Sequence, residues 1–313
     1  MTAGQLQESH CLDSLIANQN SDGGWGYQLV SPSAAEATSW VLAALGSCRQ
    51  TPPLLEACAR ASKWLLQAQG ADGSWPPFPG QPQGSWVTSV AAHALHLHGG
   101  AQEAVERGMR WVLAAWPAER TLRWRVRQSL FPSRVAHQDN TLCGWSWTPG
   151  TASWVEPTSH ALIFLRSLPP DLLPPHAAKR RQMAERMLYD RMCPGGGWNS
   201  GNPLVYGVAG VPRVSTTAWA LLGLRDHYER PQVQMSLRWL DRAYGTIRGP
   251  ASLALAHRCL AAYGRRLALR ASVVDEFYSR NRFFGNMLTM AWILLAWNEG
   301  RGMTPAATEA ATQ

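Results

Sequence analysis

The sequence has little charge, almost no lysine and no long apolar run. Charged residues make up 16% of the 313 residues, and only Lys63 and Lys179 are lysines. Such low charge with 46% hydrophobic residues excludes a chain that is disordered throughout. Because no run of 18 apolar residues occurs, no transmembrane helix is predicted. The net charge of +8 would support attraction to anions or peripheral contact with a membrane surface, and a solvated basic face is the favoured alternative. No nucleic-acid-binding motif accompanies it, so nucleic acid is not an expected partner.

The cysteines also lack the spacing of a metal or redox centre. All six occur singly, with no C-x-x-C pair. The N-terminal residues show none of the basic, apolar and small-residue segments of a secretory signal. These absences predict reduced thiols and a cytoplasmic protein, with no metal site and no cofactor.

Tryptophan is the abundant aromatic residue, with 16 Trp against 7 Tyr and 6 Phe. Several tryptophans end a repeated motif, Q-x-x-D-G-[GS]-W, at 19–25 and again at 69–75. Weaker copies occur at 144–147, which contains Trp145 and Trp147, and at 195–198, which ends in Trp198. Each copy precedes a Thr and, seven residues later, a Leu; the pairs are Thr38 and Leu45, Thr88 and Leu95, Thr158 and Leu165, and Thr217 and Leu224. Seven residues are two helical turns, so each pair shares one helix face.

Amphipathic segments alternate with apolar ones along the chain. The charged, amphipathic segments are 5–18, 53–68, 102–115, 176–190, 230–243 and 266–279. The segments rich in Ala and Leu that follow them are 34–46, 87–98, 157–167, 214–225, 250–263 and 284–297. An apolar helix must be buried on most sides, whereas an amphipathic one needs a single covered face. The pattern predicts an all-α fold, an (α/α)6 toroid of about twelve helices in six hairpin repeats. An open solenoid of the same hairpins is the alternative.

The repeat resembles a known one. Q-x-x-D-G-G-W-G at 19–26 is similar to the QW repeat of the squalene-hopene cyclase, oxidosqualene cyclase and protein prenyltransferase β-subunit superfamily. The phrase from Thr217 to Leu224 also resembles an inner helix of bacterial triterpene cyclases. This resemblance spans about 5–297 and implies one α/α toroid where triterpene cyclases have two. We expect a single domain over 1–313, with an insertion at about 117–142 as a lid and a flexible tail at 299–313.

The catalytic signatures of that superfamily are not carried over. No D-x-D-D motif occurs, and the adjacent acids Asp275 and Glu276 lie on a predicted outer helix. The zinc pattern D-x-C of the prenyltransferases is not matched either, because Asp190 and Cys193 are spaced D-x-x-C.

Two carboxylates lie at the start of predicted inner helices, where a proton donor would face the barrel cavity. Glu36 and Glu156 each lie two residues before a repeat Thr, at the start of an inner helix. A carboxyl buried in an apolar cavity gains a raised pKa and can donate a proton. Both also fit S-x-x-E, so helix capping is the alternative, favoured for Glu36. Glu156 is the preferred catalytic acid, with His160 one turn later and Asp139 in the insertion as supporting groups.

Further residues are candidates for substrate contact. The indoles at or near inner helices could stabilise a cation or could simply pack; they are Trp40, Trp219, Trp292, Trp147 and Trp154. Cys193 and Asn199 belong to a polar segment that either faces the cavity or forms a tight turn.

These features, with the resemblance, predict a terpene-cyclase-like enzyme. It would protonate an apolar isoprenoid in the barrel cavity and guide its cyclisation or isomerisation. A non-catalytic toroid that binds a lipid or a protein partner is the alternative. A carbohydrate-active (α/α)6 barrel, in which Glu156 faces a second acid across a cleft, is a third interpretation.

Overall fold

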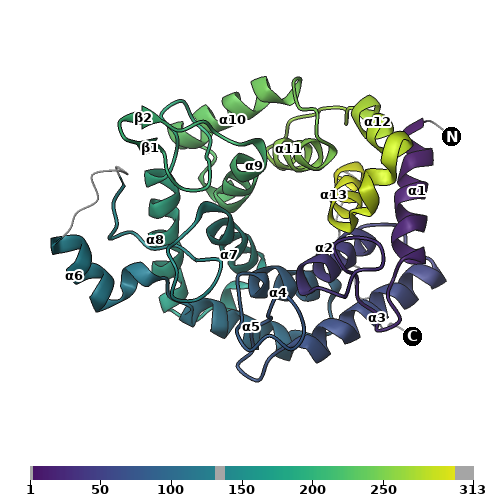
Figure 1. The fold of residues 1–313 in the computed structure, drawn as a ribbon, viewed down its shortest axis with the longest axis horizontal. Coiled ribbons are helices and arrows are strands. Elements are labelled where there is room, and N and C mark those ends of the chain that lie inside the picture. The colour runs from purple at the N-terminus through teal and green to yellow at the C-terminus, as the bar shows by residue number, and fades with distance from the viewer. Residues whose placement is uncertain (1–2, 131–137, 300–313) are drawn as a thin grey trace, which may run out of the picture.

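Twelve helices form two concentric rings in the computed structural model, which describes residues 3–130 and 138–299 (Figure 1). The inner ring consists of α2 (Ala35–Gly46), α4 (Val87–His98), α7 (Val155–Ser167), α9 (Val214–Gly223), α11 (Pro250–Ala262) and α13 (Met287–Asn298). The outer ring consists of α1 (Ala3–Ala17), α3 (Pro52–Ala68), α5 (Gln102–Ala114), α8 (His176–Asp190), α10 (Pro231–Tyr244) and α12 (Ala271–Asn281).

The inner ring is closed. Each inner helix packs against the next one in chain order, and α13 packs back against α2. The N-terminal helix α1 covers α13, so the first and last repeats lie side by side (Figure 1). The predicted toroid with six hairpin repeats is therefore confirmed, and the open solenoid is excluded.

Burial along the helices explains the two rings. In α9, every residue from Thr216 to Leu221 is buried, as an inner helix requires. In α10, the buried residues recur every three or four positions, at Val233, Ser236, Leu237, Leu240 and Tyr244. This periodicity covers one face only, so α10 can lie between the inner ring and solvent.

The repeat threonine holds the repeat tryptophan in place. The backbone N–H of Trp25 donates to Thr38 Oγ1 at 2.9 Å, and its indole Nε1 donates to the Leu15 carbonyl at 2.8 Å. The same backbone bond joins Trp75 to Thr88, Trp145 to Thr158 and Trp198 to Thr217, at 2.8–2.9 Å. All four tryptophans are at most 4% exposed. Because the fully buried Trp side chains are satisfied inside the turns, these tryptophans need no ligand to explain them.

The remaining motif residues join neighbouring repeats. Gln19 Nε2 donates to the carbonyls of Gly23 and Ala57, so it ties its own turn to α3. Asp22 accepts the indole N–H of Trp64, also on α3, at 2.9 Å. Gly23 has a φ of +95°, and a Cβ there would lie 2.8 Å from the Arg60 carbonyl oxygen. Glycine is required at this turn, which packs closely against α3 of the next repeat.

A second contact closes the ring through the loops. The loop after each repeat tryptophan offers a carbonyl to the N-terminal region of the inner helix one repeat earlier. The bonds are Ala35 N–H to the Pro77 carbonyl, Trp86 N–H to the Trp147 carbonyl, and Val155 N–H to the Ser200 carbonyl, at 3.1–3.4 Å. In the same way, the Met287 N–H donates to the Tyr27 carbonyl at 3.0 Å and so joins the last helix to the first loop.

Several elements outside the six helix pairs were not predicted. The insertion contains the short 3-10 helix Ala118–Arg120 and the helix α6 (Leu122–Leu130), which extends outside the ring (Figure 1). The loop after Trp198 contains a small antiparallel hairpin of β1 (Leu204–Val205) and β2 (Val208–Ala209). Of the predicted tail, residues 300–313 lie outside the described part of the chain, as do 131–137 of the insertion. Among the described helices, none has the length and apolar content that crossing a membrane requires.

Candidate active site

The inner helices present successive layers of side chains to the barrel axis. Two residues before the repeat Thr, the layer contains Glu36, Trp86, Glu156 and Ser215. Two residues after it, the layer contains Trp40, Val90, His160 and Trp219. Five residues after it are Ala43, His93, Ile163 and Leu222, which line a cavity further along the barrel. The spacing of three or four residues between layers is about one helical turn, so the repeat register selects what faces the axis.

The middle layer closes the barrel with aromatic rings. His160 lies 4.4 Å from Trp219 and 5.8 Å from Trp40, measured between ring centroids. Trp40 lies 5.2 Å from Trp219, and Trp292 of α13 lies 6.1 Å from each of them. We call Trp40, His160, Trp219 and Trp292 the aromatic layer. It separates a front hollow, at the N-terminal ends of the inner helices, from a rear cavity at their C-terminal ends.

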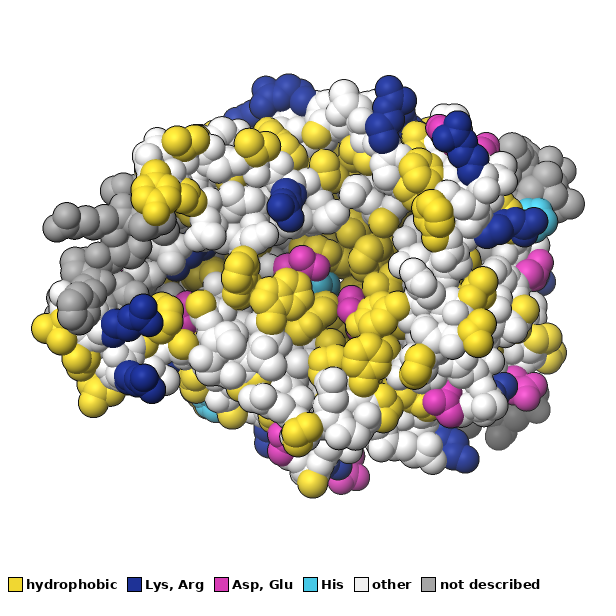
Figure 2. All heavy atoms as spheres, in the orientation of Figure 1, with side chains coloured by type: hydrophobic (Ala, Val, Ile, Leu, Met, Phe, Trp, Pro, Cys, Tyr) yellow, Lys and Arg dark blue, Asp and Glu magenta, His cyan; other side chains and the backbone are white. Residues whose placement is uncertain are grey.

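The front hollow contains both predicted carboxylates. Glu36 and Glu156 lie in the first turns of α2 and α7. Figure 2 looks into this hollow and shows acidic side chains inside it, surrounded by hydrophobic ones. The two carboxylates come from inner helices of repeats one and three and interact electrostatically across the hollow. The structure thus brings together the two acids that the sequence placed at equivalent positions.

Neither glutamate belongs to a capping box, so that interpretation is wrong for both. The N-cap residues are Ala34 and Trp154, and neither makes a side-chain cap bond. Ser33, the expected cap before Glu36, donates to Asp22 instead. Ser153 accepts the backbone N–H of Gly144. Helix capping therefore does not account for either carboxylate.

Burial raises the pKa of both carboxyls to about 7. For Glu36, the hydroxyl of Tyr27 donates to Oε2 at 2.8 Å and partly offsets this, while the charge of Glu156 adds to it. No described residue donates a hydrogen bond to Glu156, whose raised pKa comes from burial alone. Near neutral pH, a proton is thus available at the edge of an apolar hollow.

His160 lies at the site, but its described contacts are with aromatic rings and not with a carboxylate. Burial lowers its pKa to about 3, so the ring is neutral at physiological pH. Its described contacts are with the rings of Trp40, Trp86 and Trp219. The interaction expected between Glu156 and His160 along the helix is not formed, and His160 serves as part of the aromatic layer.

Trp86 is a site residue that the sequence analysis missed. It precedes α4 and lies 4.9 Å from Trp147, edge to face, as well as 5.1 Å from His160. Trp154 is the N-cap residue of α7, as Trp86 is of α4. Trp86 lies two residues before its repeat Thr, as Glu36 and Glu156 do, so the repeat register could have identified it.

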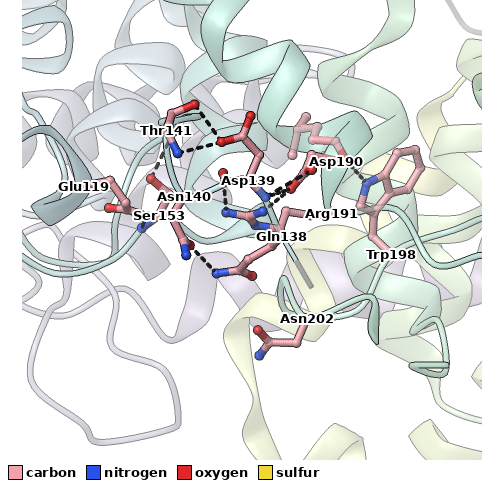
Figure 3. Close-up of polar contacts among 12 residues, drawn as sticks. Glu119, Gln138, Asp139, Asn140, Thr141, Ser153, Asp190, Arg191, Trp198 and Asn202 are labelled. Atoms are coloured by element: carbon pink, nitrogen blue, oxygen red, sulfur yellow. Dashed lines mark hydrogen bonds and ion pairs between the residues drawn. The ribbon is translucent and has the colours of Figure 1, made fainter. Parts of the chain in front are cut away.

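Asp139 lies away from the hollow. Its carboxylate accepts the N–H and hydroxyl of Thr141 at 2.8 and 2.6 Å, and its own N–H faces Asp190, which is paired with Arg191 (Figure 3). These contacts hold the pKa of Asp139 below its ordinary value. The contacts place it in a polar cluster around Arg191, apart from Glu156, whose partner it was expected to be.

Cys193 and Asn199 also serve the turn of their repeat. The Cys193 N–H donates to the Gly197 carbonyl at 2.9 Å, and the thiol is 1% exposed. Asn199 Oδ1 accepts the N–H groups of Gly201 and Asn202, each at 3.0 Å. Of the two interpretations left open, the structure therefore supports the tight turn. Among the described residues, no three His, Cys, Asp or Glu side chains are grouped as a metal site would require.

The closed double ring and its repeat turns define a class, the α/α toroids with QW repeats. Residues 9–121 match the family model of the squalene-hopene cyclase N-terminal domain. This partial match agrees with the resemblance of the repeat motif to the QW repeat of that superfamily. No curated protein is similar enough in sequence to count as a match.

Solved structures share the fold at low sequence identity. A protein from Actinoplanes is 14% identical with a TM-score of 0.64, over 96% of this chain and 100% of that one. The type II terpene cyclase MstE from Scytonema is 12% identical with a TM-score of 0.62, over 97% of this chain and 100% of that one. MstE structures include a complex with geranylgeranyl dihydroxybenzoate as substrate. A glycosidase variant is 10% identical with a TM-score of 0.59, over 95% and 96% of the two chains.

Proposed function

We propose that the protein is a terpene-cyclase-like enzyme that protonates an apolar isoprenoid in the front hollow and directs its cyclisation or isomerisation. The observation that carries the proposal is the pair of buried carboxyls, both with raised pKa, above a layer of indole rings. The match of residues 9–121 to the squalene-hopene cyclase family model and the fold shared with MstE, which has been solved with its substrate, support the substrate class.

Glu156 is the acid in this proposal. It is protonated in a substantial fraction of molecules near pH 7, and no described group competes for its proton. It would donate that proton to a carbon–carbon double bond, which leaves a carbocation. Ring closure onto a second double bond, followed by proton loss, gives an isomer of the substrate. Asp139 has no part in this step.

Glu36 and the aromatic layer would support the reaction. Glu36, held by Tyr27, lies close enough to Glu156 for the charge of Glu156 to raise the pKa of Glu36, so we expect the pair to retain one proton. The faces of Trp40, Trp219 and Trp292 carry negative quadrupole charge and stabilise a cation within about 6 Å. The apolar hollow also excludes water, which would otherwise quench the cation.

Incubation with squalene and with prenylated aromatic acids tests the proposal. We expect a cyclic isomer from at least one substrate, and loss of turnover in Glu156→Gln. The matched control is Glu276→Gln, an exposed outer-helix carboxyl whose ion-pair partner among the described residues is Arg280. No turnover with any isoprenoid, or full activity in Glu156→Gln, would reject it. Co-purified lipid without product would instead favour a non-catalytic binding toroid.

A glycosidic reaction is the second candidate, because paired carboxyls beside aromatic platforms also suit a sugar. The fold shared with a glycosidase favours this function, as does the edge-to-face pair of Trp86 and Trp147. Release of sugar from oligosaccharides, abolished in Glu156→Gln and in Glu36→Gln alike, would support this function. Under this function, neither the wild type nor the two variants would convert an isoprenoid.

We also propose that α6 brings the protein to anionic membrane surfaces, where apolar substrates reside. Leu122, Val126 and Leu130 recur every four residues and are 76%, 48% and 67% exposed. Exposed arginines at 123, 125 and 127 lie between them. An apolar stripe beside cationic side chains suits the boundary between lipid head groups and acyl chains.

A further inference from the structure

The rear cavity has a chemistry different from that of the front hollow. It encloses about 320 Å³ at the C-terminal ends of the inner helices. Its walls include apolar residues, Trp40 and Trp219 of the aromatic layer among them. Three arginines, Arg166, Arg225 and Arg258, also line it, against the single acid Glu299. The described lining therefore combines a net positive charge with an apolar end.

Helix termini account for only part of this charge. The carbonyl ends of the inner helices favour cations here. Arg166 serves that purpose, since its Nη1 donates to the Leu222 carbonyl at 2.5 Å, and it also faces Asp226 at 3.9 Å. Arg225 and Arg258 are not used in this way, and no described carboxylate pairs with Arg225.

Two buried donors around the cavity have no described acceptor. Arg258 bonds Glu299 through Nε at 3.4 Å, but its Nη1 is buried without a partner among the described groups. The indole Nε1 of Trp40, which is 7% exposed, is likewise buried and unpartnered. A buried donor without an acceptor is unfavourable, and at Arg258 a charge-assisted bond to an anion would supply the missing acceptor.

We infer that the rear cavity binds an amphipathic anion, a phosphate or diphosphate head group at Arg258 and Arg225 with a short apolar body against Trp40 and Trp219. The guanidinium groups present forked donors that match phosphate oxygens. The volume lies at the lower end of the range of ligand pockets, roughly 300–1,000 Å³, so the apolar body is short. This site is distinct from the front hollow, because the aromatic layer lies between them.

Calorimetric titration of the full chain tests the inference with three probes: geranyl diphosphate, inorganic diphosphate and geraniol. We expect geranyl diphosphate to bind tightest, because it alone supplies both the charge and the apolar body. Arg258→Gln and Arg225→Gln should each weaken its binding roughly tenfold or more, and leave geraniol unchanged. Arg110→Gln, an exposed outer-helix arginine that also removes one charge, is the matched control and should have no effect.

Other outcomes overturn the inference. Geraniol or inorganic diphosphate binding as tightly as geranyl diphosphate would contradict an amphipathic site. Equal effects of Arg258→Gln and Arg110→Gln would show a nonspecific charge effect. Loss of binding in Glu156→Gln would place the ligand in the front hollow, whereas failure of the proposed cyclisation alone would leave the rear site unaffected. A thermal melt of each variant separates a lost contact from a lost fold, and Arg258→Lys should recover part of the binding.

Discussion

At the scale of single residues, the position relative to the repeat Thr decides what a side chain does. Two residues before it, Glu36 and Glu156 face the hollow; at the Thr itself, the hydroxyl holds the turn. The sequence identified both glutamates from this register. It could not decide between acid and cap, because S-x-x-E describes a spacing, and only the structure shows that Ser33 bonds Asp22 instead.

The raised pKa values predict how stability depends on pH. A carboxyl whose pKa is about 7 in the folded state and lower in the unfolded chain favours folding in its protonated form. Stability should therefore fall as pH rises from about 5 to 8. Glu36→Gln removes the cost of ionising a buried carboxyl. The variant should therefore be more stable than wild type by on the order of 2 kcal/mol at pH 8, and by much less at pH 5. Urea unfolding at both pH values measures this; an equal effect at both would contradict it.

The repeat threonine can be tested by an isosteric change. Thr38→Val keeps the shape but leaves the buried N–H of Trp25 without its acceptor. We expect a loss of about 1–3 kcal/mol in the free energy of unfolding. Thr51→Val is the control, because Thr51 is exposed and makes no side-chain cap bond. Equal losses in the two variants would reject the assigned role.

At the scale of elements, periodicity predicted the six helix pairs within a few residues of their bounds. Inner helices bury most of their faces and outer helices bury one. The inner segments are therefore rich in Ala and Leu, whereas the outer segments are charged and amphipathic. The elements that were missed, α6 and the β1–β2 hairpin, lie outside the repeat, so no register could reveal them. The rear arginines were missed for a related reason: they come from three different repeats that only the ring brings together.

Sedimentation with liposomes tests the membrane role proposed for α6. The wild type should bind vesicles of anionic lipid and dissociate as salt rises, because surface charges are screened. A triple variant with Ala at 123, 125 and 127 should lose most of this binding. The control removes three exposed charges elsewhere, with Ala at Arg110, Arg265 and Arg280. Equal loss in both variants would show that net charge alone is responsible.

At the scale of the whole molecule, closure of the ring couples the two ends of the chain. Leu15 of α1 is fully buried, and α1 packs against α13. Leu15→Ala should therefore cost about 2–5 kcal/mol. Because the ring is closed, we expect one unfolding transition, shared by tryptophan fluorescence and circular dichroism. Separate transitions for the two probes would contradict the coupling.

The central claim is that a carboxyl of the front hollow delivers a proton to a carbon atom of an isoprenoid. The most direct measurement is mass spectrometry of the product formed in D₂O, once a turned-over substrate is found. Protonation of a double bond predicts a single deuterium on carbon in the cyclised product, a rate that falls as pH rises through about 7, and no labelled product from Glu156→Gln. Product without deuterium, or labelling that persists in Glu156→Gln, would contradict the account.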